Sequence, residues 1–449
     1  MKQPIINVSG LRGIVGESLS PELATRFVAA FAAEIPAGPI VLSRDGRTTG
    51  SMFTDALRGG LAALGREVLD LGVAATPTVG VMVRSLKAAG GVQISASHNP
   101  PEYNGLKLFD ASGRVLPAER GQRVLERFQK AEPDWVTYTH IGTVREVADT
   151  LSPHLAAVLA TVDVPRIRSR GFRVLLDSNH GAGSVLGRRL LSELGCEATL
   201  VGDTPDGRFA HPPEPTAENL HGVSSTVIER TAAVGFCQDP DADRLAVIDE
   251  RGRYVGEEYT LALCLDHVLR QTQGPIVTNC ATSRMAEDLA AKYGVAFHRS
   301  AVGEANVVDR MIAERAVFGG EGNGGPIDPR VGWVRDSFVG MALILDAMAS
   351  RELPLSQLVD ELPRYAIHKT KVEVSREQTA AAFDRLESHF PSAEASRQDG
   401  LRLDWPGRWL LVRGSNTEPI VRIIAEAESD SASQELCEQA RRVIQSVDV

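Results

Sequence analysis

The feature that most constrains this chain is a repeated alternation of short apolar runs with amphipathic helical segments. Three rounds of it precede a final stretch that is richer in strands. Such alternation is typical of α/β domains, in which helices cover a mostly parallel sheet. In each of the four parts, one apolar run leads into a loop of small and polar residues. These loops are QISASHNPPEYNGLK (93–107), FCQDPDADR (236–244), FGGEGNGG (318–325) and LVRGSNTEP (411–419).

The length of the chain sets the number of domains. At 449 residues it is too long for one ordinary core, since a domain usually holds about 100–200 residues. The restarts of the pattern predict three similar α/β domains and a smaller C-terminal α+β domain with antiparallel pairing. Ligands of α/β sheets bind beyond the carboxyl ends of strands, so the four loops can converge on one central cleft. We expect the domains at 1–147, 148–252, 253–366 and 367–449.

The composition argues against several classes of protein. Lys and Arg number 48 against 58 Asp and Glu, a formal net charge of −10 without a basic block, which suits neither nucleic acid nor anionic lipid. Five scattered cysteines without a CxxC pair indicate a reducing compartment rather than disulfides or zinc. No apolar run approaches the roughly 18–20 residues of a membrane span, and MKQPIINVSG has no signal-peptide core. We therefore expect a cytoplasmic protein without nucleic-acid or membrane partners.

The acidic loop carries Asp239, Asp241 and Asp243 at every second position. In extended backbone this spacing places all three side chains on one face. Three carboxylates at such short distances repel one another unless a hard cation lies between them. Oxygen ligands are the ones that Mg²⁺ prefers. An EF-hand is excluded because Arg244 stands at the sixth position of the loop, where glycine is needed. Arg244 also suggests an anion beside the metal; a solvated acidic turn is the structural alternative.

Ser97 follows a buried strand and precedes His98 and Asn99-Pro100, in a turn that we expect to expose its hydroxyl. The surroundings are not GxSxG, which argues against an α/β-hydrolase elbow. Beside a Mg²⁺ loop, a serine can carry and return a phosphoryl group, because the cation neutralises charge on the oxygens. His98 and Lys107 are then candidates for proton transfer. A plain turn and a surface lysine are the alternatives.

The glycine-rich loop favours recognition of a sugar. GGEGNGG contains GxGxxG, but Pro326 and Pro329 stand where a dinucleotide-binding helix would begin, which argues against that fingerprint. The glycines let a ligand approach the backbone closely, while Glu321 and Asn323 offer acceptors and a donor for hydroxyl groups. A flexible turn is the alternative.

The last loop favours recognition of a phosphate. RGSNTEP ends a strand with Arg413, hydroxyl groups and free backbone N–H groups, and Arg422 follows. Two guanidiniums and a hydroxyl-rich nest can hold a phosphate that does not react. The alternative is a hairpin turn with an exposed arginine. ATP binding by a P-loop has no support, because GxxxxGK[ST] does not occur.

Together these loops resemble those of the α-D-phosphohexomutase family, which includes phosphoglucomutases, phosphomannomutases and phosphoglucosamine mutases. The resemblance covers the whole chain, through VSGLRGIVG, SASHNP, PEYNGLK, EPTAENL, DPDADR, GEGNGG and RGSNTEP. It implies that a phosphorylated Ser97 exchanges its phosphoryl group with a hexose phosphate through a bound hexose 1,6-bisphosphate, which also acts as an activator. It further implies Mg²⁺ on the three aspartates and a phosphoserine oxygen. The other implied site residues are Arg12 and Arg244 at the reacting phosphate, Glu321 and Asn323 at the sugar, and Arg413, Ser415, Asn416, Thr417 and Arg422 at the second phosphate.

Three loops depart from the commonest family pattern. Pro240 replaces a glycine, Asn323 and Gly325 replace a serine and a histidine, and Asn416 replaces a glycine. These variants resemble the archaeal-type branch, whose members are usually named phosphoglucosamine mutase or glucose/mannose phosphomutase. We therefore expect a phosphoglucosamine mutase, alternatively a phosphoglucomutase or phosphomannomutase, as a monomer or homodimer. A catalytically inactive phosphosugar-binding regulator and a metal-dependent phosphatase are the candidates from other classes.

Overall fold

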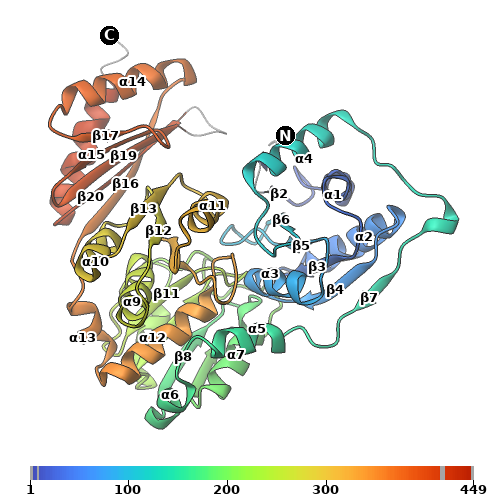
Figure 1. Cartoon of the computed structure of the whole chain (residues 1–449), viewed down its shortest axis with the longest axis horizontal. Helices are drawn as coiled ribbons and strands as arrows, with labels where there is room; N and C mark the ends of the chain where they lie inside the picture. Colours follow the sequence, from blue (N-terminus) through green and yellow to red (C-terminus); the bar gives the residue numbers. More distant parts are fainter. Residues whose placement is uncertain (1–3, 8–9, 415–419, 446–449) are drawn as a thin grey trace.

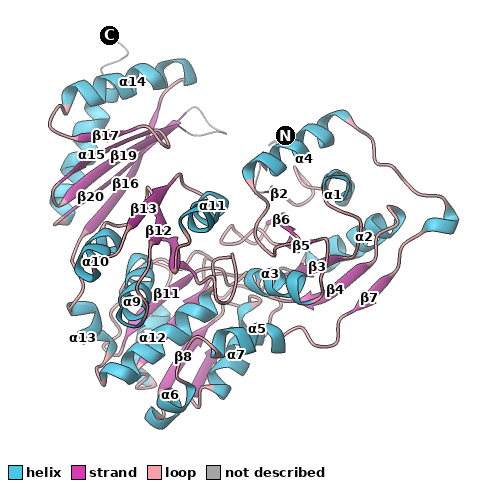
Figure 2. Cartoon of the chain, in the orientation of Figure 1, coloured by secondary structure: helices cyan, strands magenta, loops and turns pink. Residues whose placement is uncertain are grey.

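The computed structural model of the chain describes residues 4–7, 10–414 and 420–445. Within these residues the strands form four sheets, one after another along the chain (Figure 1). Helices pack against the sheet of each domain (Figure 2). The predicted class, three α/β domains and a smaller C-terminal α+β domain, is confirmed. The boundaries at 147, 252 and 366 stay predictions.

The first sheet has the strand order β1-β2-β6-β5-β3-β4-β7. Ser20 caps its first helix, since its Oγ accepts a hydrogen bond from the backbone N–H of Leu23 at 3.1 Å. The strands are β1 (Ile5–Asn7), β2 (Gly10–Ile14), β3 (Ile40–Arg44), β4 (Val68–Val73), β5 (Gly90–Ile94), β6 (Tyr103–Asp110) and β7 (Val144–Glu146). The helices are α1 (Pro21–Glu34), α2 (Gly50–Ala63), α3 (Thr76–Ser85), α4 (Ala118–Lys130) and the 3₁₀ turn η1 (Tyr138–His140).

The second and third sheets have the orders β11-β10-β8-β9 and β15-β14-β12-β13. The strands are β8 (Arg173–Asp177), β9 (Glu197–Val201), β10 (Val234–Gln238), β11 (Leu245–Asp249), β12 (Ile276–Asn279), β13 (Phe297–Ser300), β14 (Phe318–Glu321) and β15 (Gly325–Ile327). The helices are α5 (Ser152–Leu159), α6 (Val164–Arg170), α7 (Gly183–Glu193), α8 (His221–Glu229), α9 (Glu257–Gln271), α10 (Met285–Tyr293), α11 (Glu304–Glu314), α12 (Ser337–Arg351) and α13 (Leu355–Asp360).

One arrangement of strands recurs in all three α/β domains and positions the site. In each, a central strand pairs in parallel with two neighbours, and one of these turns back into an antiparallel strand. These turns are the hairpins β5–β6, β10–β11 and β14–β15. Ser97, the three aspartates and the glycine-rich loop lie on these three hairpins in turn. Equivalent topology therefore brings three distant segments to equivalent places in their domains.

The C-terminal domain is an antiparallel sheet with two helices, as expected. Its order is β16-β20-β19-β18-β17. The elements are β16 (Ala366–Glu373), α14 (Arg376–His389), β17 (Glu394–Ser396), β18 (Leu401–Trp405), β19 (Arg408–Gly414), β20 (Ile420–Ala427) and α15 (Asp430–Gln445). A small apolar cluster of Cys280, Trp409 and Leu411 joins it to the third domain. Among the described residues, no helix has the length and apolarity to cross a bilayer.

Candidate active site

Ser97 lies in the loop between β5 and β6, and its side chain is buried. Only 1% of the residue is exposed, so the expectation of an exposed hydroxyl is wrong, because facing loops cover it. Its Oγ donates a hydrogen bond to Oδ2 of Asp239 at 2.8 Å. Its backbone has a φ of 51°, in the left-handed region that non-glycine residues rarely adopt. Such strain costs about 1–3 kcal/mol and is concentrated at functional sites.

Arg47, in the loop after β3, holds this strained segment. It pairs with Asp45, whose Oδ2 lies 3.2 Å from the Nε of Arg47 and also accepts a hydrogen bond from Ser95 Oγ at 2.6 Å. Both charged residues of the pair are buried. The guanidinium donates hydrogen bonds at 2.6 to 2.9 Å to the backbone carbonyls of Ser97, Asn99, Pro100 and Tyr103. Sequence reasoning missed Arg47, although an RDGR segment directly after a buried strand is a usable signal.

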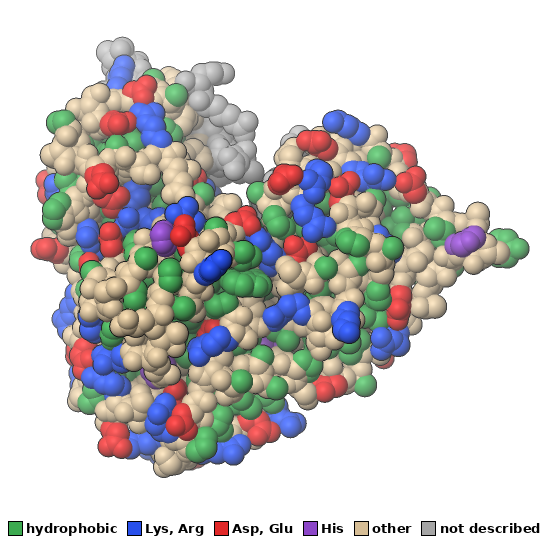
Figure 3. Space-filling model, viewed as in Figure 1, with side chains coloured by type: hydrophobic (Ala, Val, Ile, Leu, Met, Phe, Trp, Pro, Cys, Tyr) green, Lys and Arg blue, Asp and Glu red, His purple; other side chains and the backbone are tan. Residues whose placement is uncertain are grey.

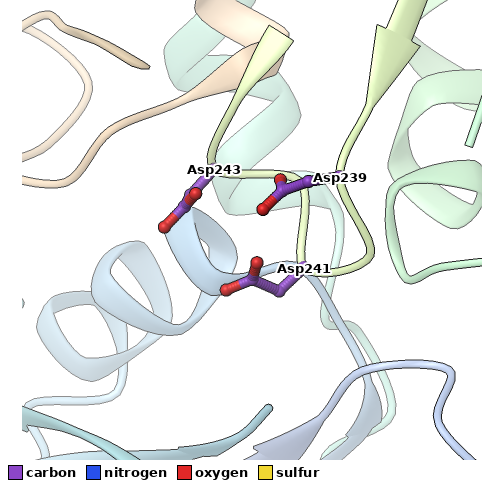
Figure 4. Close-up of side chains that lie close together, drawn as sticks. All are labelled: Asp239, Asp241 and Asp243. Carbon is purple, nitrogen blue, oxygen red and sulfur yellow. The ribbon is translucent and has the colours of Figure 1, made fainter. Parts of the chain in front are cut away.

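Asp239, Asp241 and Asp243 converge on the turn between β10 and β11, and their side chains point toward one another (Figure 4). One oxygen from each lies within 4.8 Å of the others. The expected extended backbone is wrong, since Ala242 has a φ of 55° and the chain turns sharply there. The tight turn, rather than a two-residue period, gathers the carboxylates.

Neighbouring donors set the charge of this acidic turn. Lys107 Nζ donates to Oδ2 of Asp241 at 2.8 Å and to Oδ2 of Asp243 at 2.5 Å. Burial alone would raise the pKa of Asp241, but Lys107 and the hydroxyl of Thr76 outweigh it and lower that pKa. Burial and the two neighbouring carboxylates raise the pKa of Asp239 well above its usual range. Lys107 is buried, so the alternative of a surface lysine is wrong.

The acidic turn fits a hard divalent cation. Oδ1 of Asp241 and Oδ1 of Asp243 are buried and have no hydrogen-bond partner among the described residues. All three side chains offer oxygen, the ligand atom that Mg²⁺ prefers. Ser97 Oγ, in contact with Asp239, adds a fourth oxygen to the set. The cluster can therefore hold a divalent metal ion.

His98, Arg12 and Arg244 surround Ser97. Nδ1 of His98 lies 3.3 Å from Ser97 Oγ. Burial, with Arg244 and Arg12 nearby, lowers the pKa of His98 to about 3, so the imidazole is neutral. Arg12 donates to Oδ1 of Asn99 at 3.2 Å, and the backbone N–H of Arg244 donates to Oδ1 of Asp239 at 3.1 Å. Both arginines are thus close enough to lower the pKa of His98, the residue next to Ser97, and would favour an anion there.

Glu321 ends β14 and is fixed by its neighbours. Its Oε1 accepts hydrogen bonds from Asn279 Nδ2 at 2.7 Å and from the backbone N–H of Gly303 at 3.1 Å. Asn323 Nδ2 lies 3.5 Å from Glu321 Oε2, and Asn323 Oδ1 is buried without a partner in the described part of the chain. An unpartnered amide oxygen beside a held carboxylate is suited to binding the hydroxyl groups of a ligand.

A cavity of about 670 Å³ lies between the C-terminal domain and Glu321 to Asn323 of the glycine-rich loop, called the sugar loop below for its predicted role. Arg413 and Arg422, which are cross-strand partners on β19 and β20, line it together with Glu321 and Asn323. Arg413 Nε also lies 2.9 Å from Asp399 Oδ1. A hollow between the C-terminal domain and the first domain is visible on the surface (Figure 3). The other three phosphate-loop candidates, Ser415, Asn416 and Thr417, lie outside the described residues.

Arg335 is a second buried arginine that sequence reasoning missed. It precedes α12, and its guanidinium donates to Asp243 Oδ2 at 2.6 Å and to Glu321 Oε2 at 2.8 Å. Its backbone N–H donates to Glu304 Oε1 at 2.7 Å. Asp336 beside it caps α12 by accepting hydrogen bonds from two backbone N–H groups. Arg335 and Asp336, two charged residues directly before an apolar run, are the sequence signal that could have pointed to Arg335. Lys369 and Lys371 on β16 were also missed, and both line the cavity.

Each of the four domains contributes one feature to the site. These features are a buried serine, an acidic turn, a carboxylate held by hydrogen bonds and a pair of arginines, and together they define a phosphohexomutase architecture. Family models support this class along nearly the whole chain. Phosphoglucomutase/phosphomannomutase alpha/beta/alpha domains I, II and III match residues 3–134, 152–252 and 257–365, and the C-terminal domain of the same family matches 370–443.

Curated relatives agree with the family models. A phosphoglucomutase/phosphomannomutase of Thermococcus kodakarensis is 38% identical over 447 residues, 97% of each chain. A probable phosphoglucosamine mutase of Thermococcus gammatolerans is 34% identical over 446 residues, again 97% of each. This chain therefore belongs to the phosphoglucomutase/phosphomannomutase family, the α-D-phosphohexomutases, and is an isomerase of the phosphomutase type.

Solved structures share the fold. A phosphoglucomutase/phosphomannomutase family protein from Burkholderia thailandensis superposes with a TM-score of 0.86 at 26% identity, covering 99% of this chain and 97% of that one. An Aspergillus fumigatus N-acetylphosphoglucosamine mutase, solved with GlcNAc-6P and magnesium, has a TM-score of 0.58 at 16% identity, covering 95% and 99%. The second likeness concerns the fold alone.

Proposed function

We propose that this phosphohexomutase interconverts hexose 1-phosphate and hexose 6-phosphate, with glucosamine phosphate as its favoured substrate. Ser97 would carry the phosphoryl group, and a hexose 1,6-bisphosphate would be the bound intermediate and the activator. The observation that carries the proposal is the 2.8 Å contact between Ser97 Oγ and Asp239 Oδ2, which joins an alcohol to an acidic turn across two domains.

The reaction consists of two transfers that balance each other. First the P–O bond to Ser97 Oγ breaks as a bond forms between that phosphorus and the free hydroxyl of the hexose phosphate. The bisphosphate then reorients, and its other phosphate returns to Ser97 Oγ. His98 and Lys107 are candidates for moving the proton that the sugar hydroxyl loses in one transfer and regains in the other. Arg12 and Arg244 would hold the reacting phosphate.

Asp239, Asp241, Asp243 and a phosphoserine oxygen would hold Mg²⁺, which, when bound, neutralises charge that develops on the phosphoryl oxygens. The buried, unpartnered oxygens of Asp241 and Asp243 support this assignment. The Aspergillus relative was solved with magnesium and a phosphosugar, which is consistent with it.

The substrate would be recognised by residues of the third and C-terminal domains that line the cavity. Glu321 and Asn323 would bind sugar hydroxyls, and Arg413 and Arg422 would bind the phosphate that does not react, with Ser415, Asn416 and Thr417 completing that loop. Support for glucosamine phosphate comes from several curated relatives that are named probable phosphoglucosamine mutase. The carboxylate of Glu321, which lines the cavity, would bind the ammonium group of that substrate. The name of the Thermococcus kodakarensis relative, a phosphoglucomutase/phosphomannomutase, keeps glucose and mannose phosphates as the alternative. A cytoplasmic location and a monomer or homodimer are predictions from the sequence.

The test is an assay of 1-phosphate and 6-phosphate interconversion with glucosamine, glucose and mannose phosphates, Mg²⁺ and a trace of hexose 1,6-bisphosphate. We expect the highest kcat/KM on glucosamine phosphate and loss of activity in Ser97→Ala. Intact-mass spectrometry should show one added phosphate on the wild type and none on that variant. Unchanged turnover in Ser97→Ala would refute the nucleophile, and steady release of inorganic phosphate would indicate a phosphatase.

A further inference from the structure

Arg335 is the link in a polar chain that crosses three domains. In this series of hydrogen bonds, Lys107 Nζ donates to Asp243 Oδ2 at 2.5 Å. One terminal nitrogen of Arg335 donates to the same oxygen at 2.6 Å, and the other donates to Glu321 Oε2 at 2.8 Å. Asn279 extends it by a bond to Glu321 at 2.7 Å. One guanidinium thus binds the metal-type turn with one nitrogen and the sugar loop with the other.

The Arg335 side chain occupies the space that a side chain at position 325 would fill. A Cβ atom on Gly325 would lie 2.4 Å from Cδ, 2.8 Å from Cγ and 3.1 Å from Cβ of Arg335. These atoms form the base of the side chain and cannot move away without moving the guanidinium. The absence of a side chain at position 325 therefore makes room for Arg335, which comes from the next loop.

The surroundings hold Arg335 in one orientation. Only 6% of the residue is exposed. Besides its two guanidinium bonds, its backbone N–H donates to Glu304 Oε1 at 2.7 Å, and its Nε lies 3.6 Å from Glu304 Oε2. A planar fork held among three carboxylates fixes the distance between the groups that it binds, which a flexible ammonium would not do.

We propose that Arg335 is a positioning residue that couples the sugar loop to the metal loop, in place of a side chain at position 325. This inference rests on the proposed function, because its partners are the Mg²⁺ ligand Asp243 and the sugar-binding Glu321. A sugar hydroxyl that competes for Glu321 changes how Arg335 is shared with Asp243. Binding of phosphosugar and of Mg²⁺ are therefore linked, and by linkage the effect is reciprocal.

The first experiment is calorimetric titration of Mg²⁺ into dephosphorylated protein, with and without glucose 6-phosphate. In Arg335→Met we expect Mg²⁺ to bind about fivefold more tightly, since a competing cation has left Asp243. We also expect glucose 6-phosphate to stop affecting the Mg²⁺ affinity, and kcat to fall about tenfold or more because the loops are no longer aligned. The matched control is Arg315→Met, an exposed arginine at the end of α11, which should behave as wild type.

These readouts separate positioning from mere stability, and from failure of the proposed function. If Arg335 had a purely structural role, Arg335→Met would lower both the Mg²⁺ affinity and kcat. If that variant kept the wild-type Mg²⁺ affinity and the effect of glucose 6-phosphate on it, the proposal would be overturned. Neither titration requires turnover. If the wild type does not interconvert hexose phosphates, the proposed function fails while the linkage is still measured.

A second set of variants covers the case in which Arg335→Met does not fold. Gly325→His alone should lower the free energy of unfolding strongly, because its side chain meets the Arg335 stem. The double variant Gly325→His/Arg335→Gly should be more stable than the sum of its single variants predicts, since the two side chains compete for one space. Additive losses would refute the shared space.

Discussion

Replacement of Arg47 by methionine should release the loop that carries Ser97. The guanidinium satisfies four backbone carbonyls of that loop and the buried carboxylate of Asp45. Methionine has a similar length and fills much of the same volume, but it donates no hydrogen bond. The variant therefore tests the charge and the bonds of Arg47 rather than its bulk.

The expected magnitude follows from burial. Hydrogen bonds from a charged donor contribute about 1.5–3 kcal/mol each, but the carbonyls share one loop and regain water if it opens, so their losses do not add. Removing one partner of a buried ion pair costs about 3–5 kcal/mol. Relaxation of the left-handed Ser97 returns about 1–3 kcal/mol of strain. We expect the free energy of unfolding of the first domain to fall by about 2–4 kcal/mol, and kcat to fall about 100-fold through misplacement of the serine.

Urea unfolding followed by circular dichroism and the mutase assay measure the two effects. Arg123→Met is the control, since the exposed Arg123 pairs with Glu119 on α4 and with Glu34 on α1, and such surface pairs contribute about 1 kcal/mol or less. Adding Asp45→Asn to Arg47→Met should restore part of the stability, by removing the buried charge, but not kcat. A loss below about 1 kcal/mol with kcat within twofold of wild type would refute this account of Arg47.

Two further predictions concern buried groups outside the reacting centre. Burial raises the pKa of Glu258 from 4.5 to about 8, so the folded protein binds a proton that the unfolded chain has lost, and stability should fall as the pH rises from about 4.5 to 8. Glu258→Gln should flatten that slope in melting temperatures measured across the range, and an unchanged slope would contradict it. His154 joins three domains by bonds to Thr78 at 2.9 Å and Asp336 at 2.7 Å, so His154→Leu should cost about 3 kcal/mol in urea unfolding, and a cost below about 1 kcal/mol would contradict it.

The fold was predictable where local pattern and burial agree. Strands β3, β8 and β12 are short apolar runs between turn residues, which is the usual signal for a buried strand. Helix α12 carries no such signal, because nearly all of its residues are buried and it therefore has no polar face with a 3.6-residue period. Strand β6 was missed because its Asn104 and Lys107 are polar yet buried.

The candidate site was predictable one loop at a time. The aspartates, Ser97 and Glu321 each lie in a recognisable segment, because their chemistry needs several polar residues close together in the chain. Arg335 lies 92 residues from Asp243, and no local pattern records that pair. The burial of Ser97 was missed for the same reason, since its cover comes from other domains.

The sequence by itself determined which chemical groups this protein possesses and on which loop each lies, because residue type and local spacing fix those properties. Only the tertiary structure decided how the groups are charged and joined. Lys107 and Arg335 neutralise Asp243 across domain boundaries, and Arg335 takes the space left by Gly325. Burial and Coulomb interaction depend on distance in space, and the packing of distant segments sets that distance.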